Sequence, residues 1–178
     1  KKIAPITGLT KLGIEKVPPM VARGVLFDMT QVLGVDYLKA GQTFSVKDLQ
    51  AAEKKQGVKV QKGDVVLFHT GWTDAMLEKF PEKWGAEIPG LTPELAQYLA
   101  DKEVIAVGSD TYGLDVIPPV NPMEPFQGHV ILLQQNGIYI LEAMNTGPLA
   151  KDETFEFLFV LGQAKVRGAV QMYINPIA

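Results

Sequence analysis

Short apolar runs that end in polar residues are the clearest pattern in the chain. Three of these runs occupy residues 24–29, 65–69 and 104–107. They are continuous rather than alternating, which is typical of strands that are buried on both faces. The pattern therefore predicts three buried strands whose C-terminal ends present polar side chains.

Helix signals lie between these runs. Ser45 begins a variant of the capping box, and the helix that follows is expected to end at Gly57. Thr92 and Pro93 place a cap residue and then a proline at the first position of a second helix. Because apolar strands that alternate with helices define the α/β class, we expect a mixed β-sheet flanked by helices.

The last third of the chain is less regular. Prolines crowd residues 112–128, which predicts an irregular functional loop rather than a linker. Residues 130–133, a tight turn and the strand at residues 138–142 follow, and hairpin geometry would suit them. The tail holds two β-like segments, residues 154–160 and residues 169–174.

Length and composition limit the class of protein. The 178 residues predict one domain over residues 1–178, and 47% hydrophobic against 21% charged residues exclude a disordered chain. The net charge of -3 indicates neither nucleic acid nor a membrane surface as a partner, so a small molecule is expected. The absence of cysteine excludes disulfides, thiolate zinc sites and cysteine nucleophiles.

The two histidines, His69 and His129, are the chain's only imidazoles. His129 directly follows the proline-rich segment, and Glu142 lies at the end of the next predicted strand, so a hairpin could bring the two side chains together. An imidazole and a carboxylate are a plausible pair of ligands for Zn²⁺ or Mn²⁺. The plainer alternative is a solvated pair at a loop edge. His69 ends an apolar strand, where a packed rim residue is the alternative to a catalytic one.

Other candidates follow strand ends. Asp28, Asp110 and Asp115 are carboxylates at or after such ends, and ligands of α/β sheets bind outside the carboxyl ends of strands. Asp110 is the most interesting of them, with capping of its own loop as the alternative role. Trp72 could wall an apolar pocket or serve packing alone. The sequence contains no P-loop, no G-x-G-x-x-G after a strand and no G-x-S-x-G elbow.

Several ordered segments together resemble the cyclase family of metal-dependent hydrolases, which includes kynurenine formamidase and isatin hydrolase. The segments are residues 23–28 (RGVLFD), 63–72 (GDVVLFHTGW), 108–111 (GSDT), His129, 137–142 (GIYILE) and 166–169 (VRGA). They are spread over residues 20–175, and their order is far more specific than any one of them.

The resemblance implies an α/β domain of the swivelling β/α/β type and a hydrolase that cleaves the C–N bond of a small cyclic amide, lactam or formamide. It implies a Zn or Mn cofactor held partly by His129 and Glu142. Thr70, Trp72 and Asp110 are weaker candidates for lining the substrate pocket. Family members tend to form homo-oligomers, and the apolar strand at residues 155–159 would suit such a contact.

One departure from the family pattern is concrete. The N-terminal metal motif H-x-G-T-H-x-D is absent, and the irregular residues 1–20 resemble the stretch that follows that motif. We therefore expect the chain to be the C-terminal part of a longer hydrolase. His69 stands where family members often carry arginine. The alternative function is a non-catalytic binding or structural homologue that keeps the scaffold without a complete metal site.

Overall fold

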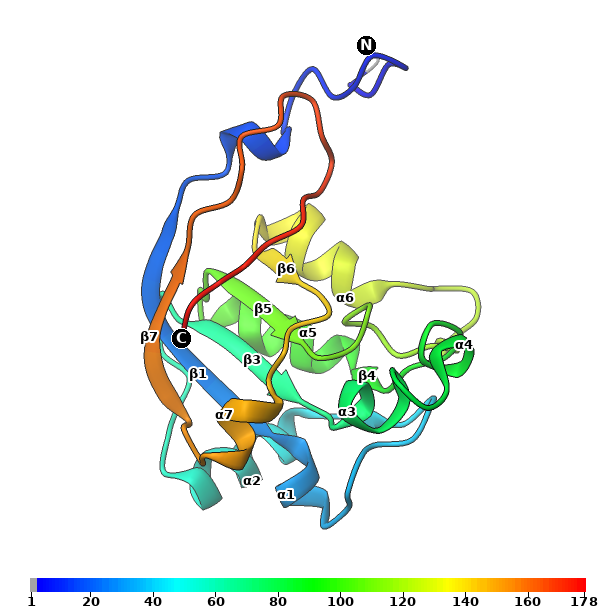
Figure 1. Cartoon of the computed structure of the whole chain (residues 1–178), viewed down its shortest axis with the longest axis vertical. Helices are drawn as coiled ribbons and strands as arrows, with labels where there is room; N and C mark the ends of the chain where they lie inside the picture. The colour runs from blue at the N-terminus through cyan, green and yellow to red at the C-terminus, as the bar shows by residue number, and fades with distance from the viewer. Residues whose placement is uncertain (1–2) are drawn as a thin grey trace. The chain divides into compact units, whose positions relative to one another are not determined.

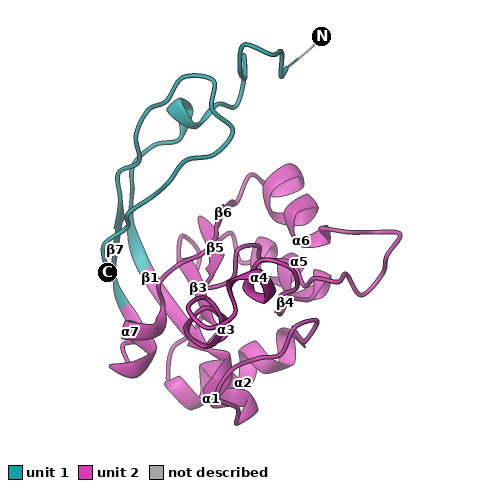
Figure 2. Ribbon diagram, turned by 45° about the vertical axis from the view of Figure 1, so that its right-hand side comes forward, with its two compact units in different colours: residues 1–23, 157–178 teal, residues 24–156 magenta. Residues whose placement is uncertain are grey.

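The computed structural model describes residues 3–178 (Figure 1), so residues 1–2 of the irregular N-terminal stretch lie outside it. The chain divides into two compact units (Figure 2). The larger unit comprises residues 24–156, and the smaller one comprises residues 1–23 together with residues 157–178. The assignment of residues 1–178 to a single domain stays a prediction.

A five-stranded sheet has the order β6-β5-β3-β1-β7. Its strands are β1 (Met20–Asp28), β3 (Val65–His69), β5 (Ala106–Ser109), β6 (Tyr139–Leu141) and β7 (Glu156–Leu161). β1 pairs parallel with β3, β3 with β5, and β5 with β6. β7 runs the other way beside β1 (Figure 1), which confirms the predicted mixed sheet.

Helices and two short strands complete the fold. They are α1 (Met29–Leu33), α2 (Val46–Gln56), α3 (Trp72–Met76), α4 (Pro81–Trp84), α5 (Pro93–Asp101), α6 (Gln127–His129), α7 (Gly147–Lys151), the 3-10 turn η1 (Ile14–Lys16), the π-helical turn η2 (Val130–Gln135), and the strands β2 (Thr43–Phe44) and β4 (Gly90–Leu91). The two predicted helices are confirmed. Ser45 and Asp48 form a capping box on α2, and Gly57 closes it in the left-handed conformation.

Strand parity explains the core. Alternate residues of a strand face opposite sides of the sheet, so Phe27 of β1 and Phe68 of β3 share one face. Both side chains are fully buried, and their ring centroids lie 6.2 Å apart. Leu49 of α2 and Leu95 of α5 belong to the same apolar cluster. The helices α2 and α5 therefore pack on this face of the sheet.

The expected hairpin between residues 130 and 142 is wrong. Residues 127–135 are helical in α6 and η2, and β6 then pairs parallel with β5. A short apolar run has the same composition in a strand and in a buried helical turn, and Leu132 is fully buried within the helical core. The predicted third strand is also shifted, because β5 begins at Ala106 rather than at Val104.

The second β-like segment of the tail is not a strand. Residues 169–174 carry no strand pairing in the structure, and Tyr173 is 98% exposed. Apolar alternation produces a strand only where a partner strand or a core is available. Ile177 instead forms an isolated antiparallel bridge with Val160, within the smaller unit.

Residues 155–159 are expected to suit an oligomer contact. Within this segment Phe159 is buried, whereas Leu158 is 64% exposed. Self-association through this strand stays a prediction. Among residues 3–178, none of the helices is sufficiently long and apolar to span a bilayer.

Candidate functional site

His129 lies between two carboxylates. Its Nδ1 is 2.6 Å from Oδ2 of Asp115, and its Nε2 is 3.3 Å from Oε1 of Glu142. His129 ends α6, Glu142 directly follows β6, and Asp115 belongs to the segment after β5. The C-terminal ends of parallel strands meet at one edge of a sheet, which is where α/β proteins bind ligands. The predicted proximity of His129 and Glu142 is present in the structure. It arises because His129 ends α6 and Glu142 follows the parallel strand β6, and no hairpin is involved.

Asp115 fixes the position of His129 through its backbone as well as its ring. Oδ1 accepts a hydrogen bond from the Gly128 N–H at 2.6 Å, and Oδ2 accepts one from the His129 N–H at 3.1 Å. The carboxylate is buried, and a Cβ at position 128 would lie 2.7 Å from Oδ1. Glycine at this position therefore allows the helix start to approach the carboxylate.

The two carboxylates change the protonation of His129. Hydrogen bonds to Asp115 and then to Glu142 raise its pKa to about 9, although burial acts in the opposite direction. At neutral pH the metal-free ring is therefore an imidazolium that donates from both nitrogens. A metal ligand must be the neutral imidazole, so metal binding at His129 has to release a proton.

Stability should depend on this protonation. Because the folded-state pKa of about 9 exceeds the ordinary 6.5, the contribution is fully present below pH 6.5 and is lost as the pH rises through 9. The side chain is 33% exposed, so screening reduces the expected loss to about 1–2 kcal/mol. Urea unfolding of the parent and of His129→Gln, near pH 6.5 and above pH 9, measures it. An identical pH dependence in both proteins would contradict this expectation.

The donor set fits a divalent metal only in part. An imidazole nitrogen and a carboxylate oxygen are the ligands that Zn²⁺ and Mn²⁺ accept, and a carboxylate on the other ring nitrogen is the usual support for a ligating histidine. Asp115 supplies that support to His129. Within residues 3–178, however, no group of three or more such side chains could hold a metal ion. His129 and Glu142 lie close together, and their role as metal ligands stays a prediction.

The residues expected to line a substrate pocket form a buried, hydrogen-bonded cluster. Thr70, Trp72 and Asp110 are each at most 3% exposed. Oδ1 of Asp110 accepts hydrogen bonds from the Thr70 N–H at 2.8 Å and from its hydroxyl at 2.7 Å. Burial raises the pKa of Asp110, and the charge of His69 and the bonds from Thr70 act against that rise. The cluster holds the turn from β3 into α3, and its role in substrate binding stays a prediction.

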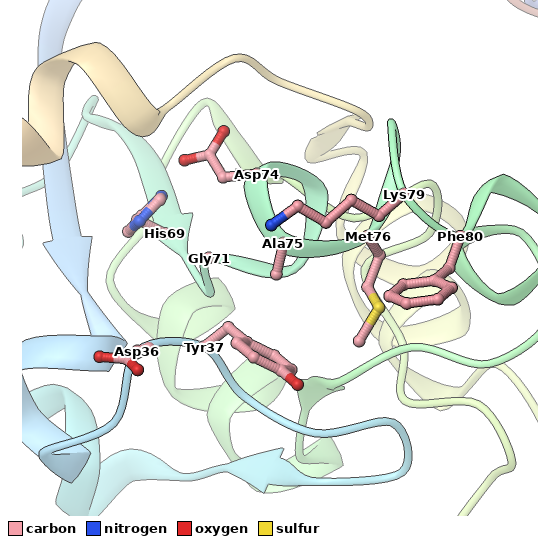
Figure 3. A pocket seen from close by; sticks show the side chains of 9 residues that line it. All are labelled: Asp36, Tyr37, His69, Gly71, Asp74, Ala75, Met76, Lys79 and Phe80. Carbon is pink, nitrogen blue, oxygen red and sulfur yellow. The ribbon is translucent and has the colours of Figure 1, made fainter.

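His69 is brought to a different place from His129. Its Nδ1 lies 2.8 Å from the hydroxyl oxygen of Thr146, which is itself buried. The ring lines a pocket of about 410 Å³ at the C-terminal end of β3 (Figure 3). His69 is thus a packed residue at the rim of the sheet that also faces an open space, and a catalytic role for it stays a prediction.

Sequence reasoning missed the roles of Asp115 and Thr146. The sequence indicates Asp115 only as a carboxylate near a strand end. The glycine at position 128, next to His129, is the one local signal that another group, here the Asp115 carboxylate, approaches the backbone at this point. Thr146 lies 77 positions from His69 and carries no local signal.

The parallel strands β1, β3, β5 and β6, with polar side chains near their C-terminal ends and helices around them, define an α/β protein. The family model "Cyclase", described as "Putative cyclase", matches residues 4–116, which is more than half of the chain. The chain therefore belongs to the cyclase family.

Solved structures agree with this assignment. A protein described as a novel cyclase is 28% identical, with a TM-score of 0.85, and the match covers 96% of this chain and 57% of that one. Isatin hydrolase A from Ralstonia solanacearum is 22% identical with a TM-score of 0.71, and the match covers 97% of this chain and 66% of that one. A potential metal-dependent hydrolase with cyclase activity is 22% identical with a TM-score of 0.63, and the match covers 90% of this chain and 66% of that one.

The two less similar structures support the fold alone. This chain spans between 57% and 66% of the length of the three proteins. No curated protein matches the sequence.

Proposed function

We propose that the chain is the metal-ligating part of a hydrolase that cleaves the C–N bond of a small cyclic amide, lactam or formamide. The observation that carries the proposal is His129 held between Asp115 and Glu142 at the ligand-binding edge of the sheet. Family membership and the resemblance to proteins described as isatin hydrolase and metal-dependent hydrolase support it.

In this proposal His129 and Glu142 hold a Zn or Mn ion. A divalent metal polarises the amide carbonyl and provides hydroxide near neutral pH. Asp115 keeps the Nδ1 proton of His129, so that Nε2 is the nitrogen free to ligate. Phe126 places its ring edge-on to the imidazole at 6.0 Å between centroids and gives the site an apolar side.

Metal binding tests the proposal. Isothermal titration of the metal-free chain with Zn²⁺ and with Mn²⁺ is expected to show weak one-to-one binding, because two ligands are provided. His129→Gln and Glu142→Gln should each weaken it at least about tenfold. Glu78→Gln, an exposed glutamate far from both residues in sequence, is the matched control and should bind like the parent.

Turnover of a lactam and of an aryl formamide with the same metals completes the test. If His129→Gln and Glu142→Gln both bind metal as tightly as the parent, the assignment of His129 and Glu142 as ligands is wrong.

The alternative is a non-catalytic homologue. One observation favours it: residues 3–178 contain no group of three or more histidine, aspartate or glutamate side chains that could hold a metal ion. Under this alternative the chain binds neither Zn²⁺ nor Mn²⁺ at His129, and the three variants are indistinguishable from the parent.

A further inference from the structure

The pocket at the C-terminal end of β3 shares no residue with the His129 site. Three segments line it: the segment after α1 with Asp36 and Tyr37, the end of β3 with His69, and α3 with the turn after it, which provide Asp74, Lys79 and Phe80. A volume of about 410 Å³ falls within the range of about 300–1,000 Å³ that is usual for small-molecule sites.

The inner wall of the pocket is a buried imidazole. His69 is 7% exposed, and Thr146 occupies its Nδ1. Nε2 has no hydrogen-bond partner among residues 3–178, and the ring lines the pocket. Because the ring lines the pocket, this nitrogen is available to a ligand that enters it.

The walls are built by close approaches of the backbone. Gly71 has a φ of 70°, and a Cβ there would lie 2.8 Å from the carbonyl oxygen of Asp36. Glycine thus lets the segment after α1 close over the end of β3, where the Leu38 N–H donates to the Thr70 carbonyl at 2.9 Å. On the other side, a Cβ at Gly147 would lie 2.4 Å from Oδ2 of Asp74.

The pocket has a charged end and an apolar end. Figure 3 shows His69 and Asp74 at one end and Met76 and Phe80 at the other, with the amino group of Lys79 directed toward the charged end. Asp36, Asp74 and Lys79 form no ion pair with another residue that the structure describes. Carboxylates and an ammonium at one end thus remain available to a ligand.

We propose that this pocket binds a free α-amino acid with a large apolar side chain. The ammonium group of the ligand would meet Asp74, and its carboxylate would meet Lys79 and Nε2 of His69. The apolar side chain would lie between Tyr37 and Phe80. A ligand with only one of the two head charges would leave either Lys79 or Asp74 unmatched.

Titration of the ¹⁵N-labelled chain followed by NMR tests this inference, with L-phenylalanine as the probe. Saturable shifts are expected at the amides of His69, Gly71 and Ala75, with a Kd of about 1 mM or tighter. Phenethylamine and 3-phenylpropanoate each lack one head charge and should bind at least about tenfold more weakly. Equal affinity of either compound, or no saturable shift up to about 20 mM L-phenylalanine, overturns the proposal.

Variants locate the site and separate it from the metal proposal. Asp74→Asn and Lys79→Gln should each weaken L-phenylalanine about tenfold, whereas Lys54→Gln, on the exposed side of α2, should have no effect. Neither pocket variant should alter Zn²⁺ binding, and His129→Gln should leave the L-phenylalanine affinity unchanged. Equal affinity in all the variants would show that the amino acid binds elsewhere and would overturn the assignment.

Discussion

Asp115→Ala is expected to lower the free energy of unfolding by about 3 kcal/mol near pH 7. The substitution removes the acceptor of three hydrogen bonds, from the N–H of Gly128, the N–H of His129 and the Nδ1–H of the same ring. Removing one partner of a buried charged pair costs more than the pair contributes, because the other partner stays buried without compensation. The imidazolium of His129, which is 33% exposed, would then be left with Glu142 at 3.3 Å as its remaining carboxylate partner.

Asp115→Asn removes the negative charge of the side chain but keeps an oxygen that accepts hydrogen bonds, so it separates these two contributions to the free energy of unfolding. Its amide oxygen can still accept from Gly128, so we expect a loss of about 1 kcal/mol. Urea unfolding of both variants measures the difference, with Asp101→Ala on the exposed end of α5 as the control for loss of a carboxylate. Equal losses for alanine and asparagine at position 115 would show that Asp115 does not act through these hydrogen bonds.

The central strands could be predicted from sequence because their signal is local. The five residues of β3 are all buried, so the continuous apolar run and the strand coincide. The capping residues of α2 and α5 were equally readable, since each cap contacts backbone within its own first turn. The helical form of residues 130–133 could not be predicted from the sequence. Its contacts involve α5 and Asp115, both of which are distant in sequence.

The candidate site was predictable in part for the same reason. His129 and Glu142 follow from the ordered family segments, and their proximity in the structure is consistent with that expectation. The supporting contacts are long-range. Asp115 lies 14 positions before His129, and Thr146 lies 77 positions after His69, so no spacing rule could have revealed either. The same holds for the pocket beside β3, which three separate segments create.

Gly90→Ala should be at least as destabilising as Asp115→Ala, with a loss of about 3–4 kcal/mol. Gly90 begins β4, and a Cβ at this position would lie 2.2 Å from the backbone nitrogen of Val116 and 2.4 Å from the carbonyl carbon of Asp115. Both atoms belong to the main chain, so no side-chain rotation can relieve the contact. The segment that carries Asp115 would have to move away from β4.

That displacement gives the prediction a second readout. If residues 114–116 move, Asp115 can no longer hold His129, and the loss of stability expected between pH 6.5 and pH 9 should largely disappear in Gly90→Ala. Gly162→Ala is the matched control, because a Cβ there meets nothing within 4 Å and its φ is not in the left-handed region. A Gly90→Ala protein as stable as Gly162→Ala would contradict the close approach of β4 to the site. One that is destabilised but keeps the full pH dependence would show that Asp115 and His129 move together.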